Sequence, residues 1–143
     1  MNPVKKTAVI HDLSGFGKCS LTAAIPILSV MGVQAVPLPT AVLSGQTGYG
    51  DYVCEDFTAP MSSISKLWKR QAVEFDGIYS GFLLNERQAD QILEFIRDFS
   101  GRETLVVVDP VLGDNGKRYD IFDSQMELAA GRLAEQAHVI TPN

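Results

Sequence analysis

Hydrophobic and polar positions along this chain follow two kinds of pattern, one typical of strands and one typical of helices. Short apolar runs rich in β-branched residues predict strands at residues 4–10, 33–42, 75–80, 104–108 and 137–140. Longer segments with apolar residues at helical spacing predict helices at residues 21–31, 62–73, 85–99 and 125–136. This order predicts an α/β fold, a doubly wound and mostly parallel sheet with helices on both faces.

Individual elements carry further signals. Helix 85–99 has the clearest amphipathic pattern, with Asn85 as its N-cap and Gly101 as its stop. The strand at 104–108 is almost continuously apolar, which predicts burial on both of its faces.

Three prolines modify two of the predicted elements. Pro26 lies inside the helix at 21–31 and predicts a kink. Pro37 and Pro39 predict an edge or irregular strand at 33–42, because proline cannot donate to a sheet hydrogen bond.

Three of the strands lead directly into polar segments that contain glycine, at residues 12–18, 44–50 and 109–117. In open α/β sheets, ligands bind outside the carboxyl ends of the strands, where glycines let backbone N–H groups approach phosphates. The pattern therefore predicts a small-molecule or nucleotide site at one edge of the sheet.

The third segment contains the strongest pair of candidate ligands, Asp109 and Asp114. Two carboxylates near a glycine turn can hold Mg²⁺ directly or through water. The alternative is a turn in which both aspartates only cap the backbone.

The first segment offers Asp12, which can accept hydrogen bonds from a bound ring or hydroxyl, or instead cap the next helix. His11, at the end of an apolar strand, is more typical of a structural histidine than of a catalytic base. Lys18 can anchor an anion, although such lysines are usually solvated.

The second segment supplies Gln46 and Thr47 as hydrogen-bonding groups and Tyr49 as a ring that can stack on an aromatic ligand. A polar surface loop is the alternative. Phe82, just beyond the strand at 75–80, can contact a ligand or join the core.

The segment 15–20 does not match either common phosphate-binding motif. A Walker A loop requires glycine where Asp12 stands and Ser or Thr where Cys19 stands. A dinucleotide fingerprint requires glycine at Ser20 and an acidic residue after the second strand, which argues against a nicotinamide oxidoreductase. A strand-to-helix turn with free backbone amides remains.

Size and charge narrow the class of protein. The 143 residues suit one domain, and the net charge of −5, without a run of Lys or Arg, argues against nucleic-acid binding. Cys19 and Cys54 lie far apart, which favours a reducing cytoplasm. No apolar run approaches the roughly 18 residues that span a membrane.

Taken together, the segments resemble the pyridoxal kinase branch of the ribokinase-like superfamily. The resemblance rests on residues 11–17, on Gln46-Thr-Gly-Tyr49, on the Asp-Pro-Val-Leu-Gly-Asp block at 109–114, and on Thr-Pro-Asn at 141–143. It covers the whole chain, which corresponds to the N-terminal half of such a kinase domain at residues 1–143.

The resemblance implies transfer of the ATP γ-phosphoryl group, with Mg²⁺, to the 5′-hydroxymethyl group of pyridoxal, pyridoxine or pyridoxamine. It implies that the substrate ring is bound by Asp12, Gln46, Thr47, Tyr49 and Phe82. It places Asp109, Asp114 and Tyr119 near ATP, and assigns Asp114 and Asn143 to the metal.

One motif of the family is absent. The Gly-Thr-Gly-Asp segment, which supplies the catalytic base and an anion hole, does not occur in the 143 residues. We therefore expect a truncated chain that has no catalytic residue of its own and is inactive by itself.

Two other functions remain open. The Asp-Leu-Ser-Gly turn at 12–15 is also similar to that of hydroxymethylpyrimidine kinases, and a non-catalytic binding module would keep the ring pocket without the chemistry. The resemblance also implies a homodimer.

Overall fold

The computed structural model describes residues 4–114, 116–119 and 123–142. Within these residues a six-stranded sheet has the order β3 (Cys54–Asp56), β2 (Gln34–Gly45), β1 (Lys6–Phe16), β4 (Gly77–Ser80), β5 (Leu105–Val108) and β8 (Val139–Ile140). Neighbouring strands are parallel except β2 and β3. The predicted, mostly parallel sheet is confirmed.

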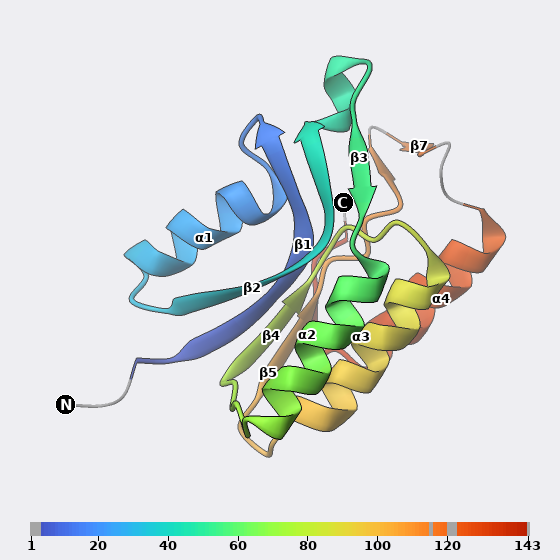
Figure 1. Ribbon diagram of the computed structural model, residues 1–143. Helices are drawn as coiled ribbons and strands as arrows, with labels where there is room; N and C mark the ends of the chain where they lie inside the picture. The colour runs from blue at the N-terminus through green and yellow to red at the C-terminus, as the bar shows by residue number, and fades with distance from the viewer. Residues whose placement is uncertain (1–3, 115, 120–122, 143) are drawn as a thin grey trace.

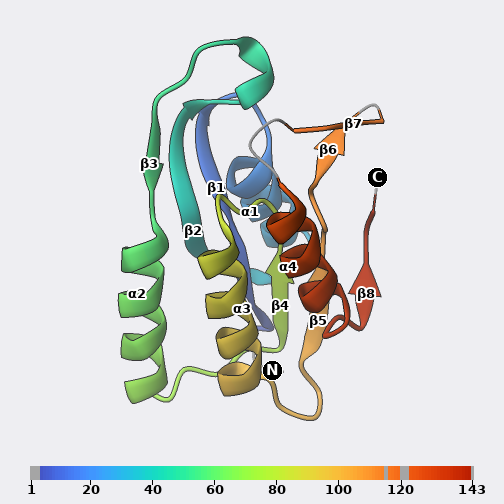
Figure 2. The same ribbon diagram turned by 90° about the vertical axis from the view of Figure 1, so that its right-hand side faces the viewer.

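The helices lie on both faces of this sheet, as predicted (Figures 1 and 2). One face carries α1 (Ser20–Val30), and the other carries α2 (Thr58–Arg70), α3 (Glu86–Phe99) and α4 (Ser124–Ala134). The main core lies between the sheet and the second group of helices, and includes Ile10, Leu38, Met61, Ile78, Ile92, Phe95, Val106 and Leu133.

Polar side chains bond the first backbone N–H groups of helices α2, α3 and α4. The Asn85 side chain accepts a hydrogen bond from the Gln88 backbone N–H at 3.1 Å, which confirms the predicted N-cap of α3. α2 begins earlier than predicted, at Thr58 after the N-cap residue Phe57, and Asp56 Oδ1 accepts from the Thr58 backbone N–H at 2.7 Å. Asp123 is the N-cap of α4, and its side chain accepts from the Gln125 and Met126 backbone N–H groups.

Strands β1 and β2 continue through residues that the sequence pattern assigned to loops. After an irregularity between His11 and Leu13, pairing resumes and reaches Phe16 opposite Gly45. The chains pack closely there, because a Cβ on Gly15 would lie 3.0 Å from the Ser44 carbonyl oxygen. The glycines therefore allow β1 and β2 to stay paired as far as Phe16 and Gly45. The segments after the two strands start from this paired end.

The prolines of β2 lie on its open edge, as predicted. β3 pairs only with residues 41–43, so Pro37 and Pro39 have a ladder partner on the β1 side alone.

The prediction that β5 is buried on both faces is wrong. Val106 and Val108 are buried in the core, whereas Leu105 is 50% exposed. The reason is that α1 packs on β1 and β2 and leaves the same face of β5 uncovered.

Beyond β5, residues 113–118 form a short antiparallel ribbon of β6 (Gly113–Asp114) and β7 (Lys117–Arg118). This ribbon and the 3₁₀ turn η1 (Thr47–Tyr49) project from the same end of the molecule (Figure 2). No described helix is both long and apolar enough to cross a membrane.

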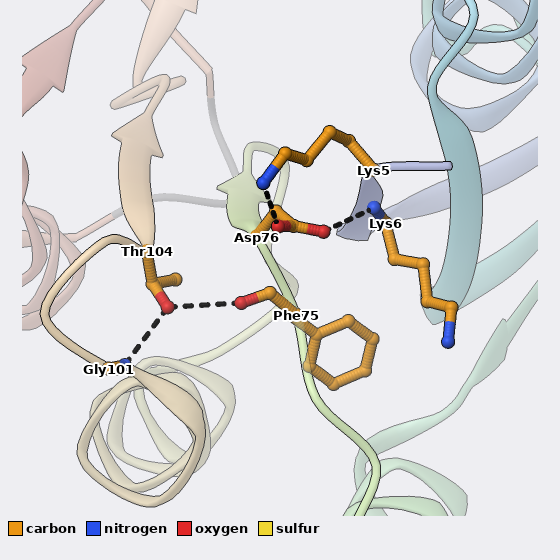
Figure 3. A network of polar contacts seen from close by, with 6 residues as sticks. All are labelled: Lys5, Lys6, Phe75, Asp76, Gly101 and Thr104. Atoms are coloured by element: carbon orange, nitrogen blue, oxygen red, sulfur yellow. Dashed lines mark hydrogen bonds and ion pairs between the residues drawn. The ribbon is translucent and has the colours of Figure 1, made fainter. Parts of the chain in front are cut away.

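The opposite end of the sheet is held by a polar network (Figure 3). Asp76 Oδ1 accepts from Lys5 Nζ at 2.6 Å, and its Oδ2 accepts from the Lys6 backbone N–H at 2.8 Å. The hydrogen bond from Lys5 holds the pKa of the Asp76 carboxyl below its usual range. The network aligns the start of β1 with the start of β4.

Candidate functional site

A cavity of about 380 Å³ lies between α1 and the carboxyl ends of β1 and β4. This volume is in the range of small-ligand pockets, roughly 300–1,000 Å³. Its lining includes Asp12, Gln46, Thr47, Phe82, Asp109 and Tyr119, which the sequence had singled out. Three polar segments far apart in the chain therefore meet at one site.

Asp12 is buried at the sheet irregularity that follows His11. Its Oδ2 accepts a hydrogen bond from Ser14 Oγ at 2.7 Å, which fixes the orientation of the carboxylate. The alternative in which Asp12 caps the next helix is wrong, because Cys19 is the N-cap of α1.

Gln46 and Thr47 line the cavity, but Tyr49 does not belong to the described lining. The Gln46 backbone N–H donates to the Phe16 carbonyl at 2.8 Å, which anchors η1 to the end of β1. Tyr49 is 64% exposed, and its ring packs against Phe16 with 5.7 Å between the ring centroids. Stacking of Tyr49 on a ligand remains a prediction.

Phe82 serves both roles that its position suggested. It lines the cavity and also packs against the core cluster. Its carbonyl accepts from Thr40 Oγ1 at 2.9 Å, which ties the segment after β4 to β2.

Asp109 and Tyr119 reach the cavity from the chain that follows β5. The Asp109 backbone N–H donates to the Ser80 carbonyl at 2.8 Å, and burial raises the pKa of its carboxyl. The Asp114 backbone lies in β6, but its side chain and Asn143 fall outside the described part of the chain. Among the described residues no group of three His, Cys, Asp or Glu is placed to hold a metal.

The sequence pattern missed the contribution of the body of α1 and of Tyr79. Ala23 and Ala24 line the cavity from α1, next to Cys19 and Ser20 of the strand-to-helix turn that the sequence had singled out. Ser20 adopts φ +49°, a strained conformation for a residue other than glycine. The alternation along β4 could have identified Tyr79, because Ile78 before it faces the core.

His11 forms part of the same wall. The residue is 5% exposed, and its ring contacts Tyr79 edge to face, with ring centroids 4.3 Å apart. Burial lowers the pKa of His11 to about 4, so the imidazole is neutral at physiological pH. His11 Nε2 has no hydrogen-bond partner among the described residues.

Charge in the cavity has one sign. The described lining carries the carboxyls of Asp12 and Asp109 and contains no Lys or Arg. Burial and then the Asp109 charge raise the pKa of Tyr79, so its phenol stays protonated. Such a site suits a neutral, dipolar or cationic ring with several polar substituents.

The chain is similar in sequence to known kinases. No family model matches the chain. The chain is 26% identical over 135 residues to a pyridoxal kinase of Granulibacter bethesdensis, covering 90% of the chain and 46% of that kinase. It is 24% identical over 145 residues to a pyridoxal kinase of Leifsonia xyli, covering 96% of the chain and 50% of that kinase.

Solved structures agree more closely. The pyridoxal kinase of Lactobacillus plantarum is 34% identical, with a TM-score of 0.91 over 99% of this chain and 50% of that one. A Bacteroides thetaiotaomicron protein, provisionally described as a phosphomethylpyrimidine kinase and crystallised with pyridoxal, is 50% identical, with a TM-score of 0.96. That match covers 99% of this chain and 49% of the other.

The sheet order, the helix layers and these matches define a ribokinase-like α/β fold. Over nearly its whole length the chain is similar to pyridoxal kinases. It spans about half the length of the curated relatives it matches.

Proposed function

We propose that this chain supplies the ring-binding half of a kinase that phosphorylates the 5′-hydroxymethyl group of a B6 vitamer with ATP. The cavity carries the proposal, because it joins Asp12, Gln46, Thr47 and Phe82 from three segments around a space of ligand size. The similarity to pyridoxal kinases, and to a protein crystallised with pyridoxal, supports the choice of ring.

In this proposal, each side of the cavity has a different task. Asp12, held by Ser14, accepts a hydrogen bond from the ring, and Gln46 and Thr47 orient its substituents. Phe82 supplies an apolar wall. Phosphoryl transfer depends mainly on positioning and on charge stabilisation, so a fixed ring is a large part of the chemistry.

ATP and Mg²⁺ belong on the side of Asp109 and Tyr119. A carboxylate is a suitable Mg²⁺ ligand, directly or through water. Asp109, which follows β5, supplies a carboxylate to the lining of the cavity. Bound Mg²⁺ would neutralise phosphate charge. Asp114 and Asn143 are proposed as further metal ligands from the resemblance alone.

The 143 residues contain no Gly-Thr-Gly-Asp segment, so the proposed base and anion hole are lacking. We propose that the chain binds the ring but does not turn it over. A homodimer is proposed from the resemblance, and sedimentation of the purified chain checks it.

Calorimetric titration of the chain with pyridoxal, pyridoxine and hydroxymethylpyrimidine, without ATP, tests the choice of ring. We expect saturable binding of the B6 vitamers and weaker binding of the pyrimidine. Asp12→Asn should weaken vitamer binding about tenfold or more, because it replaces a charged hydrogen-bond acceptor. Preference for the pyrimidine would reassign the substrate, and binding of neither ring would overturn the proposal.

Addition of MgATP separates the kinase half from a non-catalytic module. The kinase half should bind MgATP, and Asp109→Asn should weaken that binding without the same loss of pyridoxine affinity. A module would bind pyridoxine and ignore MgATP. Turnover of pyridoxal by the chain at an ordinary kinase rate would refute the proposed inactivity.

A further inference from the structure

The sheet is open at β3, along the outer edge and on both faces of that strand. Among the described strands, β3 is the last on its side of the sheet and pairs with β2 alone. All three of its residues are exposed, as is every residue from 48 to 56. Figure 1 shows β3 and η1 extending beyond helices α2 and α3. Such an edge presents backbone groups with which another strand can pair.

The free backbone groups of β3 lie at Cys54. In an antiparallel pair, every second residue bonds to the neighbouring strand, and the residues between them turn their N–H and C=O groups away from it. The Val53 carbonyl accepts from the Ser44 N–H at 2.9 Å. Four residues later, the Phe57 N–H donates to the Thr40 carbonyl at 3.1 Å. Odd-numbered residues of this segment therefore bond to β2, and the N–H and C=O of Cys54 point to the open edge.

Apolar side chains lie beside this edge. Leu13 of β1 is opposite Val42 of β2, and Val42 is opposite Glu55 of β3. Because side chains alternate along a strand, Val53 shares the face of these residues. Val53 is 69% exposed and Leu13 is 36% exposed. A partner that extends the sheet at β3 would cover this apolar face.

From this edge we infer that a second copy of the chain docks on β3, by antiparallel pairing of the two β3 strands about a two-fold axis at Cys54. The inference rests on the homodimer proposed above and assigns its surface. Two-fold symmetry requires a self-complementary surface, and an antiparallel pair of identical strands has that symmetry. The pairing joins the two sheets and satisfies the outward backbone groups of both copies.

The charges on β3 favour this register. A pair centred on Cys54 places Glu55 opposite the partner's Val53, so the two Glu55 carboxylates do not meet. A pair centred on Glu55 would place like charges directly opposite each other, which is destabilising. Asp56 does not oppose the pairing, because its carboxylate is bonded to the Thr58 backbone N–H at the start of α2, at 2.7 Å.

The far edge of the sheet suits a different occupant. β8 is the last strand on that side and ends at Ile140. The longer relatives contain about as many residues again as the match covers, and any that follow β8 leave the sheet at that edge. β3 lies at the opposite edge, where a second copy has free access.

Sedimentation of the chain over a range of concentrations, with a charge swap on β3, tests the inference. We expect a dimer that dissociates on dilution, because a strand edge buries less area than a standard interface. Val53→Glu places like charges opposite each other twice in the symmetric dimer, and should raise its dissociation constant about tenfold or more. Adding Glu55→Lys to Val53→Glu should restore the dimer, because opposite charges then face each other. Val139→Glu is the matched control: Val139 is 46% exposed on β8, and the variant should keep the wild-type dimer.

Oxidation of the chain with copper phenanthroline tests the register. Directly paired residues that exchange hydrogen bonds have Cα atoms about 5.5 Å apart, within the range that a disulfide spans. Cys54 is exposed and should link the two copies. Cys54→Ser should abolish the link, whereas Cys19→Ser should retain it.

The outcomes separate this inference from the ring-binding function. A chain that stays monomeric at all concentrations would overturn the role of β3 and the homodimer together, and leaves ring binding to its own titration. A dimer that folded Val53→Glu leaves intact, or that Val139→Glu disrupts, would overturn the role of β3 alone. Thermal unfolding shows which variants are folded. If Val53→Glu does not fold, the link through Cys54 in the wild-type chain decides.

Discussion

The imidazole of His11 occupies the space in which a side chain at position 81 would begin. A Cβ added to Gly81 would lie 2.2 Å from His11 Cε1 and 2.3 Å from Nδ1. The Gly81 backbone N–H donates to the Ile10 carbonyl at 3.0 Å, so the backbone cannot move away without losing this bond. The cavity wall at β1 therefore depends on a glycine that follows β4.

Gly81→Ala is predicted to destabilise the chain by about 1–3 kcal/mol, because the methyl group forces the imidazole out of its site. Urea unfolding measures the loss. His11→Ala combined with Gly81→Ala should recover part of the free energy, since the smaller side chain makes room. Gly131→Ala is the control: its Cβ meets nothing within 4 Å, and alanine favours the helix. Additive effects of the two substitutions would contradict the proposed clash.

Stability should fall as the pH drops from 7 to 5, because His11 resists protonation in the fold. Its pKa is about 4 when folded, against an ordinary value of 6.5, so the unfolded chain binds the proton first. The stability is present above pH 6.5 and is lost toward pH 4, with about 2 kcal/mol lost between pH 7 and pH 5. Urea unfolding at the two pH values measures this.

Other groups titrate in or near that range, so the comparison with His11→Phe isolates the histidine. Asp56 and Asp76 have lowered pKa values and lose stabilisation at still lower pH, whereas Asp109, with a raised pKa, gains it as the pH falls. These contributions are common to both proteins. An equal pH slope in the wild type and the variant would show that His11 is protonated without penalty in the fold.

The sequence predicted what local patterns determine. Helix α3 and its Asn85 cap were clear, because amphipathic spacing and a capping side chain are properties of consecutive residues. The extension of β1 to Phe16 was not, since Leu13 pairs with Val42 across a distant part of the chain. Glycines that favour a loop locally are accommodated there by strand pairing.

In the site, too, features set by local sequence could be predicted and features set by distant contacts could not. Polar residues after strands, such as Asp12 and Asp109, could be predicted because the carboxyl ends of parallel strands share one edge. The roles of α1 and of His11 could not, since they depend on which helix covers the sheet. That His11 Nε2 has no hydrogen-bond partner among the described residues is visible only when the surrounding side chains are in place.

The hydroxyl group of Thr104 is predicted to stabilise the fold at the start of β5 (Figure 3). Oγ1 donates to the Phe75 carbonyl at 3.0 Å and accepts from the Gly101 backbone N–H at 2.9 Å, and the residue is buried. Thr104→Val keeps the shape and should cost about 1–3 kcal/mol in urea unfolding, because both groups lose their partner. Thr104→Ser keeps the hydroxyl and should retain most of the stability. Equal losses in the two variants would assign the effect to packing.

Gln88 is predicted to stabilise the fold and, through Thr40, to hold Phe82 in position at the cavity. Its fully buried amide accepts from the Leu84 backbone N–H at 2.9 Å and donates to the Thr40 carbonyl at 2.7 Å and to Thr58 Oγ1 at 3.0 Å. Gln88→Glu replaces the donor with an oxygen that faces the Thr40 carbonyl, and should destabilise the chain by about 3 kcal/mol at pH 7. Thr40 also holds the Phe82 carbonyl at 2.9 Å, so pyridoxine binding should weaken as well.

Two controls sharpen this prediction for Gln88. Lower pH should restore part of the stability lost in Gln88→Glu, because a protonated carboxyl regains an O–H donor toward the Thr40 carbonyl. Gln88→Met has a similar volume and no charge, so its loss should not recover at low pH. If Gln88→Glu is as stable as the wild type and binds pyridoxine equally well, the Gln88 amide contributes neither to the fold nor to the position of Phe82.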